Sequence, residues 1–203
     1  MSLYPVMIEG SSLSALVVGG GAVALRKTSA LIDAGASVTV VSPAFDAGFD
    51  RLAESTRPPT LIVGRYDRSH IGTASLVVAA TDDAAVNETI AADARSVHRL
   101  VNVADASARG DFVTPAVHRA GPVTIAVSAG RLPSAARAIR DAIAQRFDAR
   151  YGRAAGELNA LRERLIRAGR HSEWDQVVDE ILGHEFCRSV EQGTIEEKLR
   201  AWR

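Results

Sequence analysis

Short runs of apolar residues alternate with helical patterns along the first half of the chain. Each run ends at turn-forming residues, and the runs cover residues 16–18, 38–41, 61–63, 76–80 and 100–103. Continuous apolar runs without polar alternation are typical of strands that are buried on both faces, as in a parallel sheet. The pattern therefore predicts successive strands of one open sheet, with helices between them.

Two of the intervening segments carry clear helical signals. Apolar residues recur at helical spacing after the first run, and Gly35 follows the last of them as a helix stop. Asp82 or Asp83 can cap a second helix, which runs to about Arg95. Strand, glycine turn, helix and strand within about 30 residues make a βαβ unit. The expected fold class is α/β, with a Rossmann-like parallel sheet over residues 1–113.

The pattern changes after Asp111. Alternating apolar positions over 123–127 predict a strand with one buried face, and a helix is expected over 134–147. A single strand and helix of this size cannot enclose a core. We therefore expect residues 114–150 to be a small α/β dimerisation segment that packs on a second subunit or on the first domain.

Residues 151–203 are predicted to form a helical C-terminal domain of mixed charge. One helical face carries a group of apolar residues, which are Leu158, Leu161, Leu165 and Ile166. Gly169 and Gly183 mark breaks between helices. Thr194 and Glu197 have the spacing of a capping box before a last helix.

The first apolar run ends in a glycine-rich stretch with the pattern G-x-G-x-x-A. Gly19 allows a tight turn out of the strand, Gly21 lets the backbone approach a pyrophosphate, and Ala24 permits close packing of the helix on the sheet. The helix N-terminus presents unpaired N–H groups to the anion. The pattern predicts dinucleotide binding, with a purely structural turn as the alternative. The expected contacts are Gly19, Gly20, Gly21, Ala22 and Val23.

Other expected cofactor contacts follow neighbouring strands at the same edge of the sheet. They are Ser42, Pro43, Ala44, Thr81 and Asp82. The acid that usually binds the ribose hydroxyls at the end of the second strand is absent, and no arginine follows at once to hold a 2′-phosphate. The residues alone leave NAD and NADP open, and they favour NAD slightly.

Asp105 follows the last apolar run, at the edge where ligands of such sheets bind. Its carboxylate can accept a proton during an oxidation or bind a ligand nitrogen, or it can be a solvated turn residue. Asp111, a short way on, is the nearest rival for the role of base. Ser128 can hydrogen-bond a ligand or form a turn. His118, on an expected helix face, can bind a metal or move protons, or it can be a surface or packing residue.

A group of arginines lies close in sequence to the residues of the predicted cleft. They can clamp a polycarboxylate, or they can be scattered surface charges. They are Arg26, Arg109, Arg119, Arg131 and Arg137. The histidines lack the spacing of a zinc motif, so no metal site is expected.

Composition narrows the class of protein. The chain has 203 residues, of which 47% are hydrophobic and 24% charged, as is ordinary for a globular protein. Lys+Arg and Asp+Glu balance at 24 each, so no nucleic-acid partner is expected. Cys187 is the only cysteine, which excludes an intrachain disulfide and a thiolate cluster. No apolar stretch can span a bilayer and no secretory pattern opens the chain, so we expect a cytoplasmic protein.

Several motifs coincide in one order along the chain. They are residues 17–24 followed by Arg26-Lys27, residues 35–43, residues 80–83 with Asn87, residues 101–105 and residues 111–116. This series resembles precorrin-2 dehydrogenase, the N-terminal module of siroheme synthase, over residues 1 to about 150. The Arg-Lys, Thr-Asp-Asp…Asn and Asn-Val-x-Asp elements make the resemblance specific. The tail resembles the family's helical C-terminal domain in length and character.

The resemblance implies an NAD-dependent oxidation of precorrin-2 to sirohydrochlorin by a homodimer. Some members of the family also insert ferrous iron to give siroheme. Asp105 matches the aspartate proposed in the family as general base and chelatase residue. Asn102 belongs to the same element, and Ser128 and Gly130 match a loop near the tetrapyrrole. These three residues are therefore the expected substrate contacts.

One motif departs from the family. The Ser-x-Gly-Gly-x-Ser-Pro loop is altered, with Ala129 in place of a small hydroxyl residue and one residue fewer before Pro133. The departure leaves the chelatase step open. A non-catalytic dinucleotide-sensing module is the alternative function, although it does not need residues 102–105 or Thr114-Pro115. A third alternative is a ferrochelatase that no longer carries out the oxidation, but the intact glycine turn argues against this function.

Overall fold

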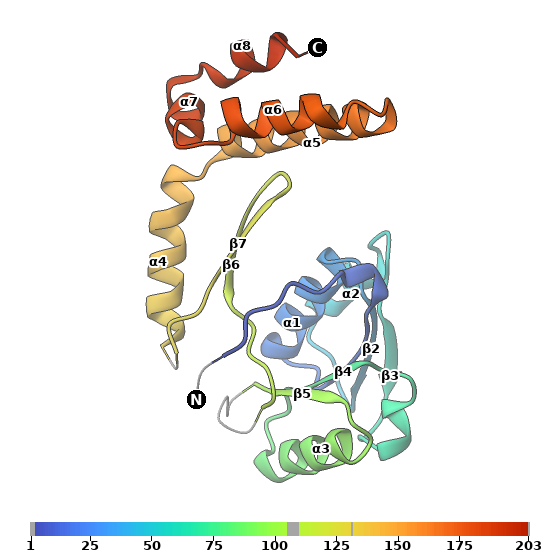
Figure 1. The fold of residues 1–203 in the computed structure, drawn as a ribbon. Helices are drawn as coiled ribbons and strands as arrows, with labels where there is room; N and C mark the ends of the chain where they lie inside the picture. Colours follow the sequence, from blue (N-terminus) through green and yellow to red (C-terminus); the bar gives the residue numbers. More distant parts are fainter. Residues whose placement is uncertain (1–2, 105–109, 131, 203) are drawn as a thin grey trace. The chain divides into compact units, whose positions relative to one another are not determined.

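The computed structural model describes residues 3–104, 110–130 and 132–202. The chain forms two compact units, Met1–Val113 and Thr114–Arg203 (Figure 1). The first is an α/β domain, and the second combines a β-hairpin with helices. A division of the second unit into a dimerisation segment and a separate helical domain stays a prediction.

A five-stranded parallel sheet forms the centre of the first unit, in the order β3-β2-β1-β4-β5. The strands are β1 (Ser14–Val18), β2 (Ser37–Ser42), β3 (Thr60–Val63), β4 (Leu76–Ala79) and β5 (Leu100–Val103). Val18 pairs with Val41 on one side and with Ala79 on the other, so the carboxyl ends of β2, β1 and β4 meet at one edge. The predicted Rossmann-like sheet is confirmed, because the apolar runs form its strands.

Helices cover both faces of this sheet. They are α1 (Ala22–Asp33), α2 (Gly48–Ala53) and α3 (Ala84–Ser96), and 3₁₀ turns cover Gly10–Ser12 and Arg68–Ile71 (Figure 1). Gly35 follows α1 with a φ of +93°, in the left-handed region that favours glycine, as predicted. Asp83 caps α3, where its carboxylate accepts from the N–H groups of Ala85 at 2.8 Å and Val86 at 3.2 Å.

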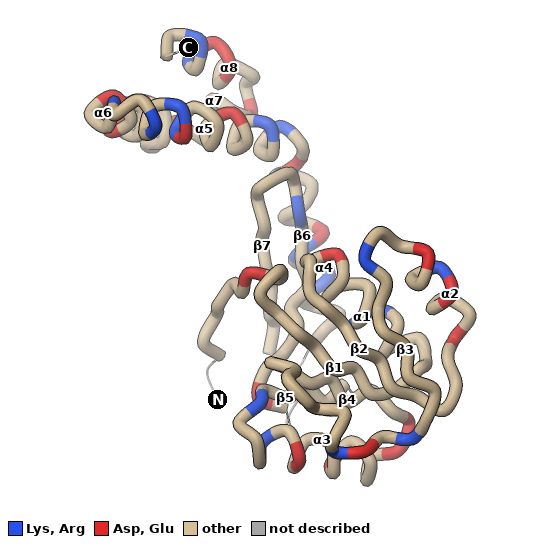
Figure 2. The backbone as a smooth tube through the Cα atoms, turned by 90° about the vertical axis from the view of Figure 1, so that its right-hand side faces the viewer, with Lys and Arg blue, Asp and Glu red and all other residues tan. Residues whose placement is uncertain are grey.

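Two apolar clusters fill the space between the sheet and its helices. The cluster beneath α3 includes Leu16, Val41, Val77, Ile90 and Val101. The cluster beneath α1 includes Val17, Ala24, Val40, Phe49 and Val78. Successive strand residues alternate between the clusters, and the strands carry no charged residue (Figure 2). Full burial of one such side chain contributes about 1.5–3 kcal/mol to the stability of the fold. The two clusters therefore stabilise the sheet from which the loops of the site extend.

The second unit begins with an antiparallel hairpin of β6 (Ala116–Ala120) and β7 (Val123–Val127). The sequence analysis had placed His118 on a helix, which is wrong. The turn at Gly121, whose φ is +54°, lets residues 116–120 pair fully with β7. The turn also packs on α5, since a Cβ added at Gly152 would lie 2.6 Å from the carbonyl oxygen of Ala120.

Helices make up the rest of the second unit. They are α4 (Pro133–Arg146), α5 (Ala149–Arg167), α6 (His171–Ile181), α7 (Phe186–Gln192) and α8 (Ile195–Arg200). Leu158, Leu161 and Leu165 are buried in their common core, as their spacing predicted. The predicted capping box is wrong, because Thr194 donates its hydroxyl to the carbonyl oxygen of Ser189 at 3.4 Å and makes no cap on α8. Among the described residues, no helix has the length and apolarity needed to cross a membrane.

Candidate dinucleotide site

The glycine turn after β1 is packed against both neighbouring strands. A Cβ added at Gly19 would lie 2.2 Å from the carbonyl oxygen of Ala80, and the φ of Gly19 is +125°. A Cβ at Gly20 would lie 1.9 Å from the carbonyl oxygen of Ala44 and 2.6 Å from Oγ of Ser42. Both positions therefore require glycine for packing, before any ligand is considered.

Gly21 differs from the other two glycines. It precedes α1 in an extended conformation, and a Cβ added there would meet no atom of the described residues within 4 Å. No side chain caps the start of α1, so the helix offers backbone N–H groups at Ala22 and Val23, which are both exposed. Open space beside an uncapped helix start suits an anion such as a pyrophosphate. The residues present therefore fit a dinucleotide.

The loop after β2 is tied to the glycine turn. Ser42 is buried, and its hydroxyl donates to the carbonyl oxygen of Ala44 at 2.6 Å. Pro43 and Ala44 are exposed beside it. The N–H of Asp46 donates to the carbonyl oxygen of Gly20 at 2.7 Å. Asp46 was not predicted from the sequence, because it lies beyond the end of β2 at Ser42, where a ribose-binding acid usually stands. Its exposed carboxylate is the acidic group of this loop.

The turn after β4 is held by the Thr-Asp-Asp…Asn element. Asn87 is 2% exposed, and its Oδ1 accepts from the hydroxyl of Thr81 at 2.8 Å and from the Thr81 N–H at 3.1 Å. Its Nδ2 donates to the carbonyl oxygen of Thr81 at 3.0 Å. Thr81 adjoins the glycine turn, because a Cβ on Gly19 would lie 3.2 Å from its N–H nitrogen. The element thus fixes a wall of the site and leaves Asp82 exposed.

Asn102 lies in β5, two strands from the glycine turn, and is 4% exposed. Its Nδ2 donates to the carbonyl oxygen of Phe112 at 2.9 Å, while its buried Oδ1 has no hydrogen-bond partner among the described residues. Asp105, the predicted base, lies outside the described residues. Ser128, which is exposed, and Gly130, with a φ of +61°, belong to the second unit. The structure therefore brings together the predicted cofactor contacts, which follow β1, β2 and β4, but it places Asn102 on β5 and Ser128 and Gly130 in the second unit.

Charge and metal ligands complete the description of the site. Burial, with the charge of Arg26 next to it, lowers the pKa of the Lys27 amine on the second turn of α1. No group of metal-ligating side chains gathers in the part of the chain that the structure describes. His118 is committed elsewhere, since its Nε2 donates to the carbonyl oxygen of Phe147 at 2.6 Å. Of the roles considered for His118, a packing role is the one that fits this contact.

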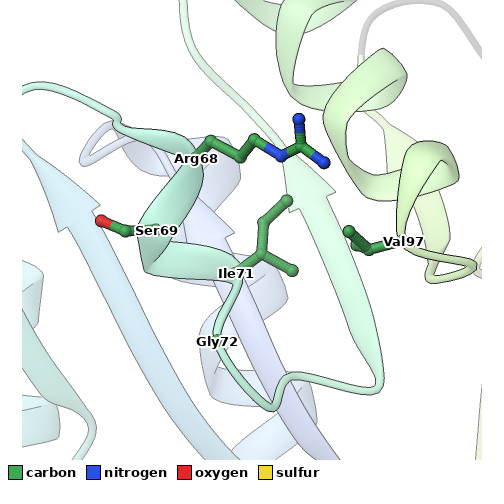
Figure 3. Close-up of a pocket in the computed structure, with 5 residues that line it drawn as sticks. All are labelled: Arg68, Ser69, Ile71, Gly72 and Val97. Carbon is green, nitrogen blue, oxygen red and sulfur yellow. The ribbon is translucent and has the colours of Figure 1, made fainter.

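A cavity of about 400 Å³ lies at the opposite edge of the sheet. It is lined by Arg68, Ser69, Ile71, Gly72 and Val97 (Figure 3). The guanidinium of Arg68 donates to Oγ of Ser96 at 2.9 Å, and the hydroxyl of Ser69 donates to Asp67 at 2.5 Å. Because these polar groups are already paired and the lining is otherwise apolar, the cavity has no part in the dinucleotide site.

The sheet order and the open glycine turn after its central strand define a dinucleotide-binding protein of the Rossmann class. A family model described as "Putative NAD(P)-binding" matches residues 6–116, and the chain belongs to that family.

Two siroheme synthases are similar to this chain. The one from Chromobacterium violaceum is 40% identical over 156 residues, which is 76% of this chain and 33% of that protein. The one from Methylobacillus flagellatus is 34% identical over 200 residues, which is 95% of this chain and 42% of that protein. The chain thus spans well under half the length of these relatives.

A solved structure titled "SirC, precorrin-2 dehydrogenase" has a fold similar to that of this chain. The TM-score is 0.73 at 25% sequence identity, and the match covers 96% of this chain and 100% of that one. The similarity therefore includes the second unit, beyond the residues that the family model matches.

Proposed function

We propose that this chain is an NAD-dependent precorrin-2 dehydrogenase that oxidises precorrin-2 to sirohydrochlorin in siroheme biosynthesis. The observation that carries the proposal is the open backbone at Gly21, at the edge where the ends of β2, β1 and β4 meet. Similarity over the whole length of a protein titled as a precorrin-2 dehydrogenase supports the choice of substrate. A cytoplasmic location is part of the same proposal.

NAD, when bound, supplies the hydride acceptor. In the proposal, the backbone from Gly19 to Val23 holds the pyrophosphate, and Pro43 and Ala44 border the adenosine side. The choice of NAD over NADP is supported by the charge of the loop after β2. That loop contains no cation up to Asp46, and the carboxylate of Asp46 disfavours a 2′-phosphate.

The oxidation also releases a proton, and we assign its acceptance to Asp105. Asp105 directly follows Ala104, which packs against the cluster beneath α1, the helix that begins at the glycine turn. Asp111, the rival, has both carboxylate oxygens engaged by protein groups. Asn102, Ser128 and Gly130 are proposed substrate contacts, and the buried acceptor Oδ1 of Asn102, which has no partner in the described part of the chain, supports the first of them. Ferrous iron is a second proposed substrate.

A homodimer is proposed because α4 and the hairpin leave apolar side chains exposed or only half-buried. The helix buries only Ala136 fully within the chain, while Leu132 before it is 62% exposed and Ile139 is 47% exposed. The inward positions of β7 are only half-buried. A second copy of this surface would cover these apolar groups, as isologous interfaces do.

The deciding experiment mixes purified protein with precorrin-2 and NAD under anaerobic conditions, and follows the sirohydrochlorin spectrum with and without ferrous iron. Formation of sirohydrochlorin only when NAD is present supports the dehydrogenase. NAD binding without turnover would instead support the dinucleotide-sensing module. A faster appearance of siroheme with the protein than without it would assign the chelatase step.

A further inference from the structure

The cavity of about 400 Å³ at the far edge of the sheet has an apolar floor. Ile71, in the 3₁₀ turn before β4, is 3% exposed and belongs to the cluster beneath α3. Val97, directly after α3, is 36% exposed, and Figure 3 shows the side chain of Ile71 extending toward it. Small-molecule sites have volumes of about 300–1,000 Å³. The cavity is therefore large enough for the apolar body of a small ligand.

A guanidinium lies beside this apolar floor. Arg68 extends from the 3₁₀ turn toward α3 (Figure 3), and its Nη2 donates to Oγ of Ser96 at 2.9 Å. Within residues 3–104, 110–130 and 132–202 it makes no other hydrogen bond or ion pair. A guanidinium carries five N–H groups, so Arg68 keeps several donors for a ligand. The hydroxyl of Ser69 points away from Ile71 and Val97 in the same view.

The charge around the cavity favours an anion. Residues 66–72 and 93–99 contain three arginines and two aspartates, so the two segments carry a net positive charge. Both aspartates are engaged, since Asp67 accepts from the N–H of Ser69 at 2.8 Å and Asp93 accepts from the hydroxyl of Tyr66 at 3.1 Å. Arg99 adds a second cation near the end of α3, and its buried Nε has no hydrogen-bond partner in the described part of the chain.

We propose that this cavity binds a monocarboxylate with a short apolar chain, with the carboxylate on Arg68 and the chain against Ile71 and Val97. A guanidinium fits one carboxylate through two parallel N–H···O bonds. A phosphate dianion or a nucleotide would bring charge that a single exposed arginine does not balance, beside a floor that cannot hydrate it. The proposal does not rest on the proposed function, because the lining residues precede β4 and β5, whereas the glycine turn follows β1.

Hexanoate is the probe, and hexanol is its neutral counterpart with the same carbon chain. We expect the methyl resonances of Ile71 and Val97 to shift as hexanoate is added, with a Kd on the order of 1 mM, as suits a ligand of so few atoms. Hexanol should bind at least about tenfold more weakly, because it cannot form the charged pair with Arg68. Unmoved methyl resonances at about 20 mM hexanoate, or equal affinity for hexanol, overturn the proposal.

Two variants locate the ligand. Arg68→Gln keeps a donor for Ser96 and removes the charge, so the Kd for hexanoate should rise at least about tenfold while weak binding of hexanol is unchanged. Val97→Phe fills the cavity and should weaken both ligands. If that variant does not fold, Val97→Leu adds a single methylene and should act in the same direction. Hexanoate affinity in Arg68→Gln equal to that of the parent shows that the proposal is wrong.

A matched control removes one positive charge elsewhere in the same unit. Arg57 is exposed and donates to the carbonyl oxygen of Gly35 at 2.9 Å, as Arg68 donates to Ser96. Arg57→Gln should leave the Kd for hexanoate unchanged, and an equal loss in both arginine variants would overturn the proposal. Calorimetry with NAD keeps the two sites apart, since Arg68→Gln should bind NAD as the parent does. Loss of NAD affinity in that variant would contradict a separate site, whereas a parent that binds hexanoate but no NAD would contradict only the proposed function.

Discussion

A Cβ at Gly20 would lie 1.9 Å from the carbonyl oxygen of Ala44, whereas one at Gly21 would meet no atom within 4 Å in the part of the chain that the structure describes. The φ of Gly21 is −83°, which any residue adopts. At the scale of single residues, the glycine turn therefore combines a position needed for folding with a position left free for a ligand.

Gly21→Asp should abolish NAD binding with little loss of stability. The new side chain fills the space proposed for the pyrophosphate, and its charge repels the phosphates. Calorimetric titration with NAD and a thermal melt check both halves of this expectation. Gly20→Ala is the contrasting variant, and it should destabilise the fold. Unchanged NAD affinity in the Gly21 variant would show that the cofactor assignment is wrong.

Asp105→Asn should lower turnover of precorrin-2 by about 10²–10⁴-fold, the usual contribution of a positioned general base. NAD binding should stay nearly unchanged, because the pyrophosphate contacts lie at residues 19–23. If the protein also inserts iron, that step should slow as well. Steady-state kinetics decides between this role and one in which water takes the proton. A turnover within about threefold of the parent would remove Asp105 as the base.

At the scale of elements, the sequence predicted those strands whose formation depends mainly on the burial of apolar side chains. The strands of the first unit were predictable because parallel strands buried on both faces need continuous apolar runs. β6 was not, because it mixes the half-buried Val117 and His118 with the exposed Arg119, and only the pairing with β7 makes it a strand. Similarly, Asp111 looked like a second candidate base in the sequence, since a bond to a backbone N–H across ten residues leaves no local pattern.

The junction of α4, α5 and α7 has a predictable response to acid. Glu191 accepts from Nε of Arg146 at 2.7 Å and from the hydroxyl of Tyr151 at 2.9 Å, and these bonds hold its pKa below the usual value. A depressed pKa gives stability that is present above the unfolded pKa, about 4.3, and is lost as the pH falls through the folded value.

We therefore expect the melting temperature of the protein to fall between about pH 5 and pH 3, and to fall less in a Glu191→Gln variant. Circular dichroism at 222 nm as a function of pH and temperature measures both. Glu163→Gln is the control, because the pair of Glu163 with Arg167 is largely exposed and contributes little. The same acid sensitivity in parent and Glu191 variant would contradict the assignment.

At the opposite end of the pH scale, burial raises the pKa of Tyr151 to about 12. A raised pKa gives stability that is complete below the unfolded value, about 10, and is lost as the pH rises through 12. Tyr151 is packed between Phe147 and Phe186, so its ionisation would place a charge inside an aromatic cluster.

At the scale of the whole molecule, the proposed dimer predicts a sedimentation coefficient that corresponds to two copies of the chain at micromolar concentration. Ile139→Glu, which puts a charge on the exposed apolar side of α4, should give monomers that remain folded. Val178→Glu is the control, since Val178 is a similarly exposed residue of α6. A stable monomer of the parent protein would rule out the dimer.

The contact of Gly20 with Ser42 and Ala44 has a consequence for protein engineering. A change of cofactor from NAD to NADP would mean exchanging the loop after β2, because this loop borders the 2′ position of the adenosine ribose in the Rossmann fold. Here the carbonyl oxygen of Gly20 accepts from Asp46 at 2.7 Å, so the loop also sets the backbone of the glycine turn. An exchanged loop would shift the part of the backbone proposed to hold the pyrophosphate, which both cofactors share. A successful swap must transplant the two segments together.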